Sequence, residues 1–167
     1  RLVDALDELD VLDDTVIVLL SDNGASQEGG PGGVLHEMKY FNLVFDGAED
    51  MVPHLDEIGG PHSHTNYPWG WAQAGNAPGR WYKQNTHGGG VRAPCIWHWP
   101  AGIGDAGGLR HQFHHVTDIA PTIYEMVGVA PPERHRDREQ IPIAGTSMGY
   151  ALADEAAPTR KGVQYFE

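Results

Sequence analysis

A run of apolar residues constrains this chain more than any other feature of its sequence. The segment from Val16 to Ser21 consists mostly of β-branched residues and leucine, without alternation of apolar and polar side chains. This pattern is typical of a strand that is buried on both faces, as in the centre of a parallel sheet. The run therefore predicts a central strand of an α/β sheet.

Two oxygen-bearing side chains, Asp22 and Asn23, follow this strand directly, and Gly24 comes next. Ligands of open α/β sheets bind beyond the carboxyl ends of the strands. A carboxylate and an amide carbonyl at that place are hard donors, suited to Ca²⁺ or Mg²⁺. Asp-Asn-Gly is also a favourable turn sequence. Taken alone, the three residues leave a metal site and a plain turn both open.

A second segment, residues 67–100, adds a lysine and a stretch of glycines. Lys83 is followed by Gly88 to Gly90, and Cys95 to Pro100 reads as another strand. Together with Ser21 to Gly24, and in this order, these segments resemble the sulfatase family, in particular the long bacterial arylsulfatases of the alkaline-phosphatase-like superfamily. The resemblance covers nearly the whole chain and also rests on Gly59 to Pro61, Tyr67 to Ala72, His115 to Tyr124 and Tyr165 to Glu167.

The resemblance implies a role for three residues of the site. Asp22 and Asn23 match the pair that ligates a divalent cation, usually Ca²⁺, with Mg²⁺ as a possibility. Lys83 matches a catalytic lysine that contacts the sulfate group. An ammonium group with three donors suits a tetrahedral oxyanion, and fixed cations near the sulfuryl and leaving oxygens lower the barrier to ester cleavage. Without the resemblance, Lys83 reads as a solvated surface lysine.

The fold implied by the resemblance is α/β, with a mainly parallel sheet and helices on both faces, and it is incomplete here. We expect residues 1–167 to be part of a sulfatase catalytic domain. Residues 24–87 would be a loop-rich insertion, and residues 140–167 the approach to the carboxyl-terminal subdomain. The 22 glycines and 12 prolines agree with extensive loops.

The nucleophile of the family has no match in this chain. Sulfatases use a formylglycine made from Cys or Ser in a Cys/Ser-x-Pro-x-Arg context. The single cysteine, Cys95, has Trp97 and Trp99 at the places of Pro and Arg. We expect it to be a small buried apolar residue. The chain therefore reads as a middle-to-carboxyl-terminal fragment that needs the remainder of its own catalytic domain and has no turnover alone.

The histidines of the insertion give a weaker signal. His62 and His64 have the spacing of a metal pair, but zinc normally takes three or four protein ligands, so a surface loop is the simpler interpretation. In the family this insertion lies near the active-site mouth. His64 or Trp69 is accordingly a candidate contact to the aryl part of a substrate.

Several elements are predicted outside the site. Leu2 to Leu9 has apolar residues at helical spacing, Lys39 to Phe45 reads as a small strand or helical turn, and His111 to Val116 reads as a strand. We expect a helix after Thr117 or Asp118 that stops at Gly128, a short helix from Gly145 to Leu152 and a strand from Gly162 to Glu167.

The implied reaction is hydrolysis of a small-molecule sulfate ester, with the intact protein a sulfuric ester hydrolase. A phosphodiesterase or phosphonate hydrolase of the same superfamily, and a non-catalytic calcium-binding remnant, stay open as alternatives. The net charge of −12 argues against nucleic acid as a partner, and the acidic residues gather at residues 4–14 and 46–57 as solvated surface. No apolar run is long enough for a membrane segment. The compartment, cytoplasmic or exported, is not readable from the sequence.

Overall fold

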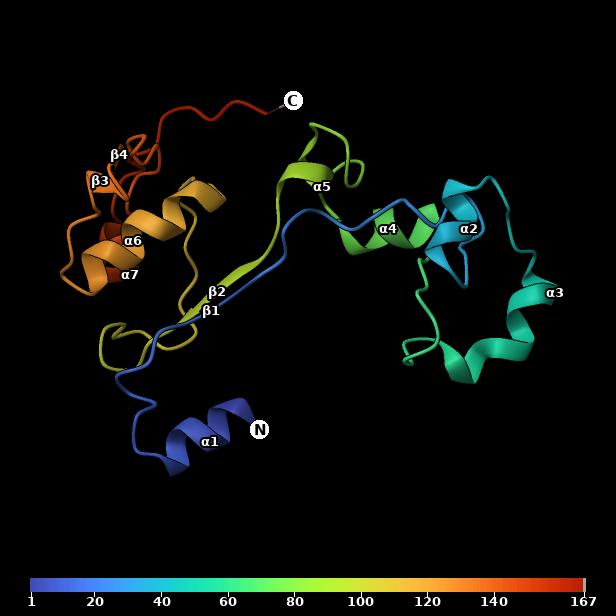
Figure 1. Ribbon diagram of the computed structural model, residues 1–167, viewed down its shortest axis with the longest axis horizontal. Helices are drawn as coiled ribbons and strands as arrows, with labels where there is room; N and C mark the ends of the chain where they lie inside the picture. Colours follow the sequence, from blue (N-terminus) through green and yellow to red (C-terminus); the bar gives the residue numbers. More distant parts are fainter. Residues whose placement is uncertain (167) are drawn as a thin grey trace. The chain divides into compact units, whose positions relative to one another are not determined.

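The computed structural model describes residues 1–166 and divides the chain into two compact units. The first unit contains residues 1–19 and 96–165, and the second contains residues 20–95 and residue 166. Each unit is described by itself below. The elements are labelled in Figure 1.

Two of the predicted strands, the one before the Asp22–Asn23 turn and the one that begins at Cys95, are present. β1 (Ile17–Leu20) and β2 (Cys95–His98) form a two-stranded sheet (Figure 1). Backbone hydrogen bonds flank the pair, from Ala101 N to Asp13 O at 3.1 Å and from Ser21 N to Pro94 O at 3.3 Å. Because residue 13 lies beside residue 101 and residue 21 beside residue 94, the two strands run antiparallel.

The predicted burial of the first strand on both faces is wrong for the described residues. Leu19 is 64% exposed and Leu20 is 39% exposed. Within residues 1–166, β1 pairs with β2 alone, so neither a second neighbouring strand nor a covering helix excludes water from these side chains. The apolar composition is typical of a strand that is buried on both faces, but no neighbouring strand or helix of the described residues covers those faces.

The first unit contains most of the helices that the sequence predicts. α1 (Leu2–Glu8) and α6 (Ile119–Met126) form where expected, and α7 (Gly149–Ala153) is shorter than predicted. Asp118 is the N-cap residue of α6, after the 3-10 helix η2 (Val116–Asp118), and Gly128 ends the helix with a positive φ of 65°. A small hairpin joins β3 (Arg134–His135) to β4 (Arg138–Glu139).

A buried polar cluster holds the first unit together. Asp118 is fully buried and accepts hydrogen bonds from the backbone N of Thr146 at 2.8 Å and from Lys161 Nζ at 2.9 Å. Thr122, also fully buried, donates to the Asp118 carbonyl and accepts from Met148 N. These bonds join α6 to the segment before α7 and to Lys161.

Two strand predictions in this unit fail. His111 to Val116 forms no strand, because its polar groups bond elsewhere: the Gln112 amide donates to two carbonyls of residues 155–157, and Phe113 N donates to the Thr159 hydroxyl. The segment from Gly162 to residue 166 is irregular, and Glu167 lies outside the described residues.

The second unit is made of short helices joined by long loops. Its elements are α2 (Glu37–Phe41), α3 (Ala48–Met51), η1 (Val52–Glu57), α4 (Trp69–Gly75) and α5 (Gly88–Val91). Of the two possibilities for Lys39 to Phe45, the helical one is confirmed. Isolated bridges pair Val34 with Asn66 and His36 with His64, and Val34 is almost fully buried. Among residues 1–166, no helix is long and apolar enough to cross a membrane.

Candidate active site

The turn after β1 presents the two predicted metal donors. Asp22 is exposed and Asn23 is half-buried. The side-chain nitrogen of Asn23 donates to the Gly24 carbonyl at 2.9 Å, and the Ser21 hydroxyl donates to the Asn23 carbonyl at 2.8 Å. The first bond orients the amide group, whose Oδ1 is the atom that a hard cation would take.

Glycines let this turn pack directly on the backbone of α5. Gly24 is buried, its N–H donates to the Gly90 carbonyl at 3.1 Å, and a Cβ added to Gly24 would lie 1.8 Å from Gly89 O. A Cβ added to Gly89 would lie 1.8 Å from Trp81 O, and one on Gly90 would lie 2.0 Å from Asn85 O. The turn, α5 and the loop of residues 81–85 are thus in backbone contact, which any side chain at these glycines would prevent.

Lys83 belongs to that loop and is tied to the residue after Gly24. Its N–H donates to the Ala25 carbonyl at 2.9 Å. The Asn76 side chain joins the same two segments, since it accepts from Ala25 N at 2.8 Å and donates to Trp81 O at 3.2 Å. The structure therefore brings the segment of the oxygen pair and the segment of the lysine together within the second unit.

The Lys83 ammonium group forms a two-pronged ion pair that the sequence did not reveal. Its Nζ donates to both carboxylate oxygens of Glu28, at 3.0 and 2.9 Å. The Glu28 side chain is 12% exposed and that of Lys83 is 32% exposed. The Ser26 hydroxyl donates to the same carboxylate at 2.8 Å. Hydrogen bonds from Lys83 and then Ser26 outweigh burial and lower the pKa of Glu28.

The two candidate aryl contacts lie in different surroundings. The His64 ring is 3.2 Å from the carboxylate of Glu37, and its side chain is 78% exposed. The Trp69 indole N–H donates to the Gln27 carbonyl at 2.7 Å, next to Glu28 in sequence. The Gln27 side chain in turn donates to the side chain of Gln84, the residue after Lys83. Of the two candidates, Trp69 is the one linked to the segment of the lysine, through Gln27.

Comparison with known proteins decides the family. The model of the sulfatase family matches residues 1–129, which include the turn, α5, Glu28 and Lys83. The chain belongs to the sulfatase family. It is 33% identical over 137 residues to an uncharacterised sulfatase of Schizosaccharomyces pombe, with 79% of this chain and 23% of that protein covered. It is 29% identical over 135 residues to an arylsulfatase of Klebsiella aerogenes, with 80% of this chain and 27% of that protein covered. The chain thus spans about a quarter of the length of these relatives.

Membership of the sulfatase family implies an alkaline-phosphatase-like α/β fold, and the described helices and small sheets are those of a mixed α/β chain. The matched region ends just after α6. All the predicted site residues of this sulfatase chain therefore lie inside it, whereas the β3–β4 hairpin and α7 lie outside.

The side chains at the turn have the donor chemistry of a hard-cation site. Ca²⁺ takes six to eight oxygen ligands. Asp22 and Asn23 offer at most three such oxygens, two on the carboxylate and one on the amide, so the donor chemistry fits Ca²⁺ or Mg²⁺ while the number calls for further ligands. Among residues 1–166, no three or more His, Cys, Asp or Glu side chains gather in a way that could hold a metal ion.

The cysteine of this sulfatase chain is not the buried apolar residue that the sequence suggested. Cys95 is exposed, at the start of β2. The cause is the one that exposes Leu19 and Leu20: in the described residues β2 belongs to a sheet of two strands. Its sequence context still excludes it as the source of formylglycine.

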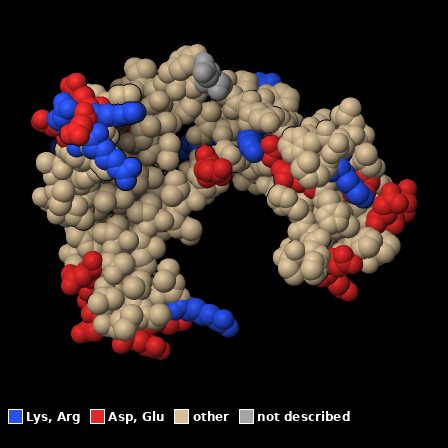
Figure 2. Space-filling view, viewed as in Figure 1, with Lys and Arg blue, Asp and Glu red and all other residues tan. Residues whose placement is uncertain are grey.

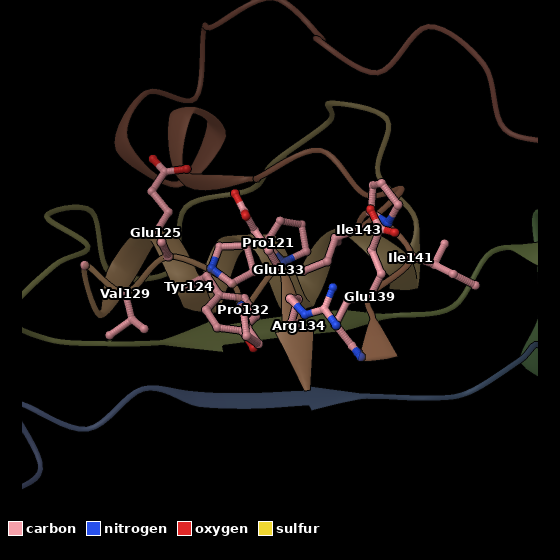
Figure 3. A pocket seen from close by; sticks show the side chains of 15 residues that line it. Pro121, Tyr124, Glu125, Val129, Pro132, Glu133, Arg134, Glu139, Ile141 and Ile143 are labelled. Atoms are coloured by element: carbon pink, nitrogen blue, oxygen red, sulfur yellow. The ribbon is translucent and has the colours of Figure 1, made fainter. Parts of the chain in front are cut away.

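A separate hollow of about 1030 Å³ lies in the first unit (Figure 3). Residues of α6 and of the segment 128–143 surround it, and Pro121, Tyr124, Ile141 and Ile143 give it an apolar wall. Neither the turn residues nor Lys83 line it. The hollow and the predicted site are therefore different places on the chain.

Proposed function

We propose that the intact protein is a sulfuric ester hydrolase of the arylsulfatase type, and that this chain supplies part of its calcium site and its sulfate-contacting lysine. The observation that carries the proposal is the backbone contact between the Asp22–Asn23 turn, α5 and the Lys83 loop. Membership of the sulfatase family and the similarity to an arylsulfatase support the choice of reaction.

In the proposed mechanism, Asp22 and Asn23 would hold Ca²⁺, or Mg²⁺, through their side-chain oxygens. The chemistry supplied by such a cation would be polarisation of a sulfuryl oxygen and neutralisation of negative charge on it. The Lys83 ammonium group donates hydrogen bonds to the sulfate group and steadies the leaving oxygen. The nucleophile is a formylglycine, which we place in a part of the catalytic domain upstream of this chain.

We infer that β1 and β2 belong to a larger sheet with helices on both faces, which is mainly parallel although these two strands run antiparallel to each other. The exposed Leu19 and Leu20 are the side chains that the remainder of the catalytic domain would cover. Residues 24–87 are then an insertion beside the site, and residues 140–167 approach the carboxyl-terminal subdomain. The natural partner is a small-molecule sulfate ester, for whose aryl group Trp69 is a better placed contact than His64.

The test uses the full-length protein, prepared with Ca²⁺ and formylglycine, and an aryl sulfate such as p-nitrophenyl sulfate. We expect Lys83→Ala to lower kcat/KM by about 100-fold, as for loss of one charge-stabilising donor. Arg134→Ala is the control, because Arg134 is an exposed cation in β3, outside the region that the family model matches, and it should stay within about twofold. Equal activity of the two variants would refute the role of Lys83.

A diester substrate separates the remaining candidates. Faster hydrolysis of bis-p-nitrophenyl phosphate than of the aryl sulfate by the wild-type protein would favour the phosphodiesterase or phosphonate hydrolase. Absence of turnover with both esters, together with retained Ca²⁺ binding, would favour the non-catalytic remnant.

A further inference from the structure

The partner of Lys83 is built into the fold. Glu28 lies five residues after Asn23 and is held from several sides: its carboxylate accepts from the Ser26 hydroxyl, and its own N–H donates to the Ser26 oxygen at 3.1 Å. The preceding residue, Gln27, is bonded to both Trp69 and Gln84. A carboxylate fixed by its own turn and by both neighbouring segments can fix the ammonium group that it binds.

This ion pair differs from an ordinary surface pair. Exposed pairs gain little because both side chains stay mobile and water competes for them. Here the carboxylate is 12% exposed and both its oxygens accept from Lys83 Nζ. The pKa of Glu28 is lowered by these bonds, so the carboxylate is ionised at neutral pH. Lys83 therefore presents to a ligand an ammonium group whose charge is already balanced.

Because the charge of Lys83 is balanced by Glu28, the charge of the ester affects which substrate the site prefers. An ester of sulfate carries one negative charge, whereas a monoester of phosphate carries nearly two at pH 7. A carboxylate within about 3 Å of the ammonium nitrogen repels a doubly charged ester about twice as strongly as a singly charged one at the same place. The donor geometry of Lys83 is retained for both esters, so the difference between them is electrostatic.

We propose that Glu28 is a positioning residue for Lys83 and that its charge makes the site prefer singly charged sulfate esters to doubly charged phosphate monoesters. The inference rests on the proposed function. Glu28 does not touch the reacting atoms in this account. It acts by holding Lys83 and by setting the net charge beside the sulfate group.

The experiment compares Glu28→Gln and Glu28→Asp in the full-length enzyme, with p-nitrophenyl sulfate and p-nitrophenyl phosphate as substrates. Glu28→Gln removes the charge and keeps the size, so we expect the sulfate-to-phosphate ratio of kcat/KM to fall about tenfold. Glu28→Asp keeps the charge but shortens the reach, so kcat for the sulfate should fall several-fold while the ratio is unchanged. Glu57→Gln is the control, because Glu57 is an exposed residue that pairs with His54, and both quantities should stay the same.

A second readout does not depend on turnover. Acetic anhydride labels lysine amines, and mass spectrometry compares the labelling of Lys83 with that of Lys39 in the same molecule. In Glu28→Gln, we expect Lys83 to label several-fold faster relative to Lys39, because its two charge-assisted hydrogen bonds are weakened.

The outcomes test the charge preference and the positioning role separately, and they distinguish a failure of either from a failure of the proposed function. An unchanged substrate ratio in Glu28→Gln would overturn the charge preference, and unchanged labelling or an unchanged kcat in Glu28→Asp would overturn the positioning role. If Glu28→Gln does not fold, Glu28→Asp still decides the positioning role. If the wild-type protein hydrolyses neither ester, the proposed function fails and the charge preference with it, and labelling alone decides whether Glu28 holds Lys83.

Discussion

At the scale of single residues, Gly24 is a position of the candidate site that has no room for a side chain. A Cβ there would overlap the Gly89 carbonyl, at 1.8 Å, and neither backbone segment has a flexible end that could give way. We expect Gly24→Ala to destabilise the full-length protein by about 2 kcal/mol or more. Gly70 is the matched control, since it lies in α4 of the same unit with nothing within 4 Å of an added Cβ. Gly70→Ala should be neutral or stabilise by about 0.5–1 kcal/mol.

Urea unfolding of the two glycine variants measures this difference. A Gly24→Ala protein as stable as wild type would mean that the contact between the turn and α5 is looser than the structure has it.

The buried Asp118 predicts how stability depends on pH. Burial acts to raise the pKa of Asp118, but hydrogen bonds from Thr146 N, Lys161 and His115 N outweigh burial, so its pKa is lowered. As the pH falls, the carboxyl group takes up a proton at about pH 4 in the unfolded chain, at a higher pH than it does in the folded protein. Its contribution is thus present above about pH 4 and is lost as the pH falls toward the folded-state pKa.

The substitution Asp118→Asn should make stability fall less steeply at acid pH and should lower stability at neutral pH. It leaves the Lys161 ammonium group, 8% exposed, without its carboxylate, and breaking a buried pair in this way costs about 3–5 kcal/mol. Thermal unfolding between pH 3 and pH 8 measures both effects, with the exposed Asp137→Asn as a control. An equally steep loss of stability at acid pH in Asp118→Asn would rule out Asp118 as the source of that loss.

At the scale of elements, the end of β1 should behave as part of a calcium site. Asp22→Asn removes the negative charge and one of the two carboxylate oxygens, and we expect the affinity of the full-length protein for Ca²⁺ to fall about tenfold or more. Calorimetric titration with Ca²⁺ gives the affinity directly. Asp10→Asn, in an exposed turn with a φ of 56° that Asn also adopts, should leave it unchanged. Equal affinities in the two variants would exclude Asp22 as a ligand.

Elements were predictable from sequence where the signal is local. β1, β2 and α6 each carry an apolar pattern and an end signal within a few residues, and all three form. His111 to Val116 failed because its polar groups bond to residues more than 40 positions away, such as Thr159. Glu28 was missed for the same reason: its partner Lys83 is 55 residues away, and only Ser26 hinted at a fixed carboxylate.

At the scale of the whole molecule, the surface is acidic and the described core is small. In the view of Figure 2, acidic side chains gather over α1 and over the α3–η1 region, in separate groups. Large apolar side chains stay exposed in both units, among them Leu19, Phe41 and Ile96. Exposed apolar surface of this extent commonly marks an interaction surface or a liability to aggregate.

We expect the 167-residue chain alone to show no hydrolysis of aryl sulfates and to bind the dye ANS, because its apolar strand faces stay open to water. The full-length protein should turn over the ester and bind less dye per residue. Measurable sulfatase activity of the pure chain would contradict the proposal that the nucleophile comes from another part of the protein.

The contact among Gly24, Gly89 and Gly90 also limits how such an enzyme can be diversified. Backbone lies against backbone there, so no side chain between the turn and the Lys83 loop can be enlarged or trimmed to widen the site. If the proposed function holds, new substrate ranges would instead come from exchanging residues of the insertion, such as Trp69, while the spacing between the Asp22–Asn23 turn and Lys83 stays constant. A mutational library should therefore vary residues of the insertion and keep the three glycines unchanged.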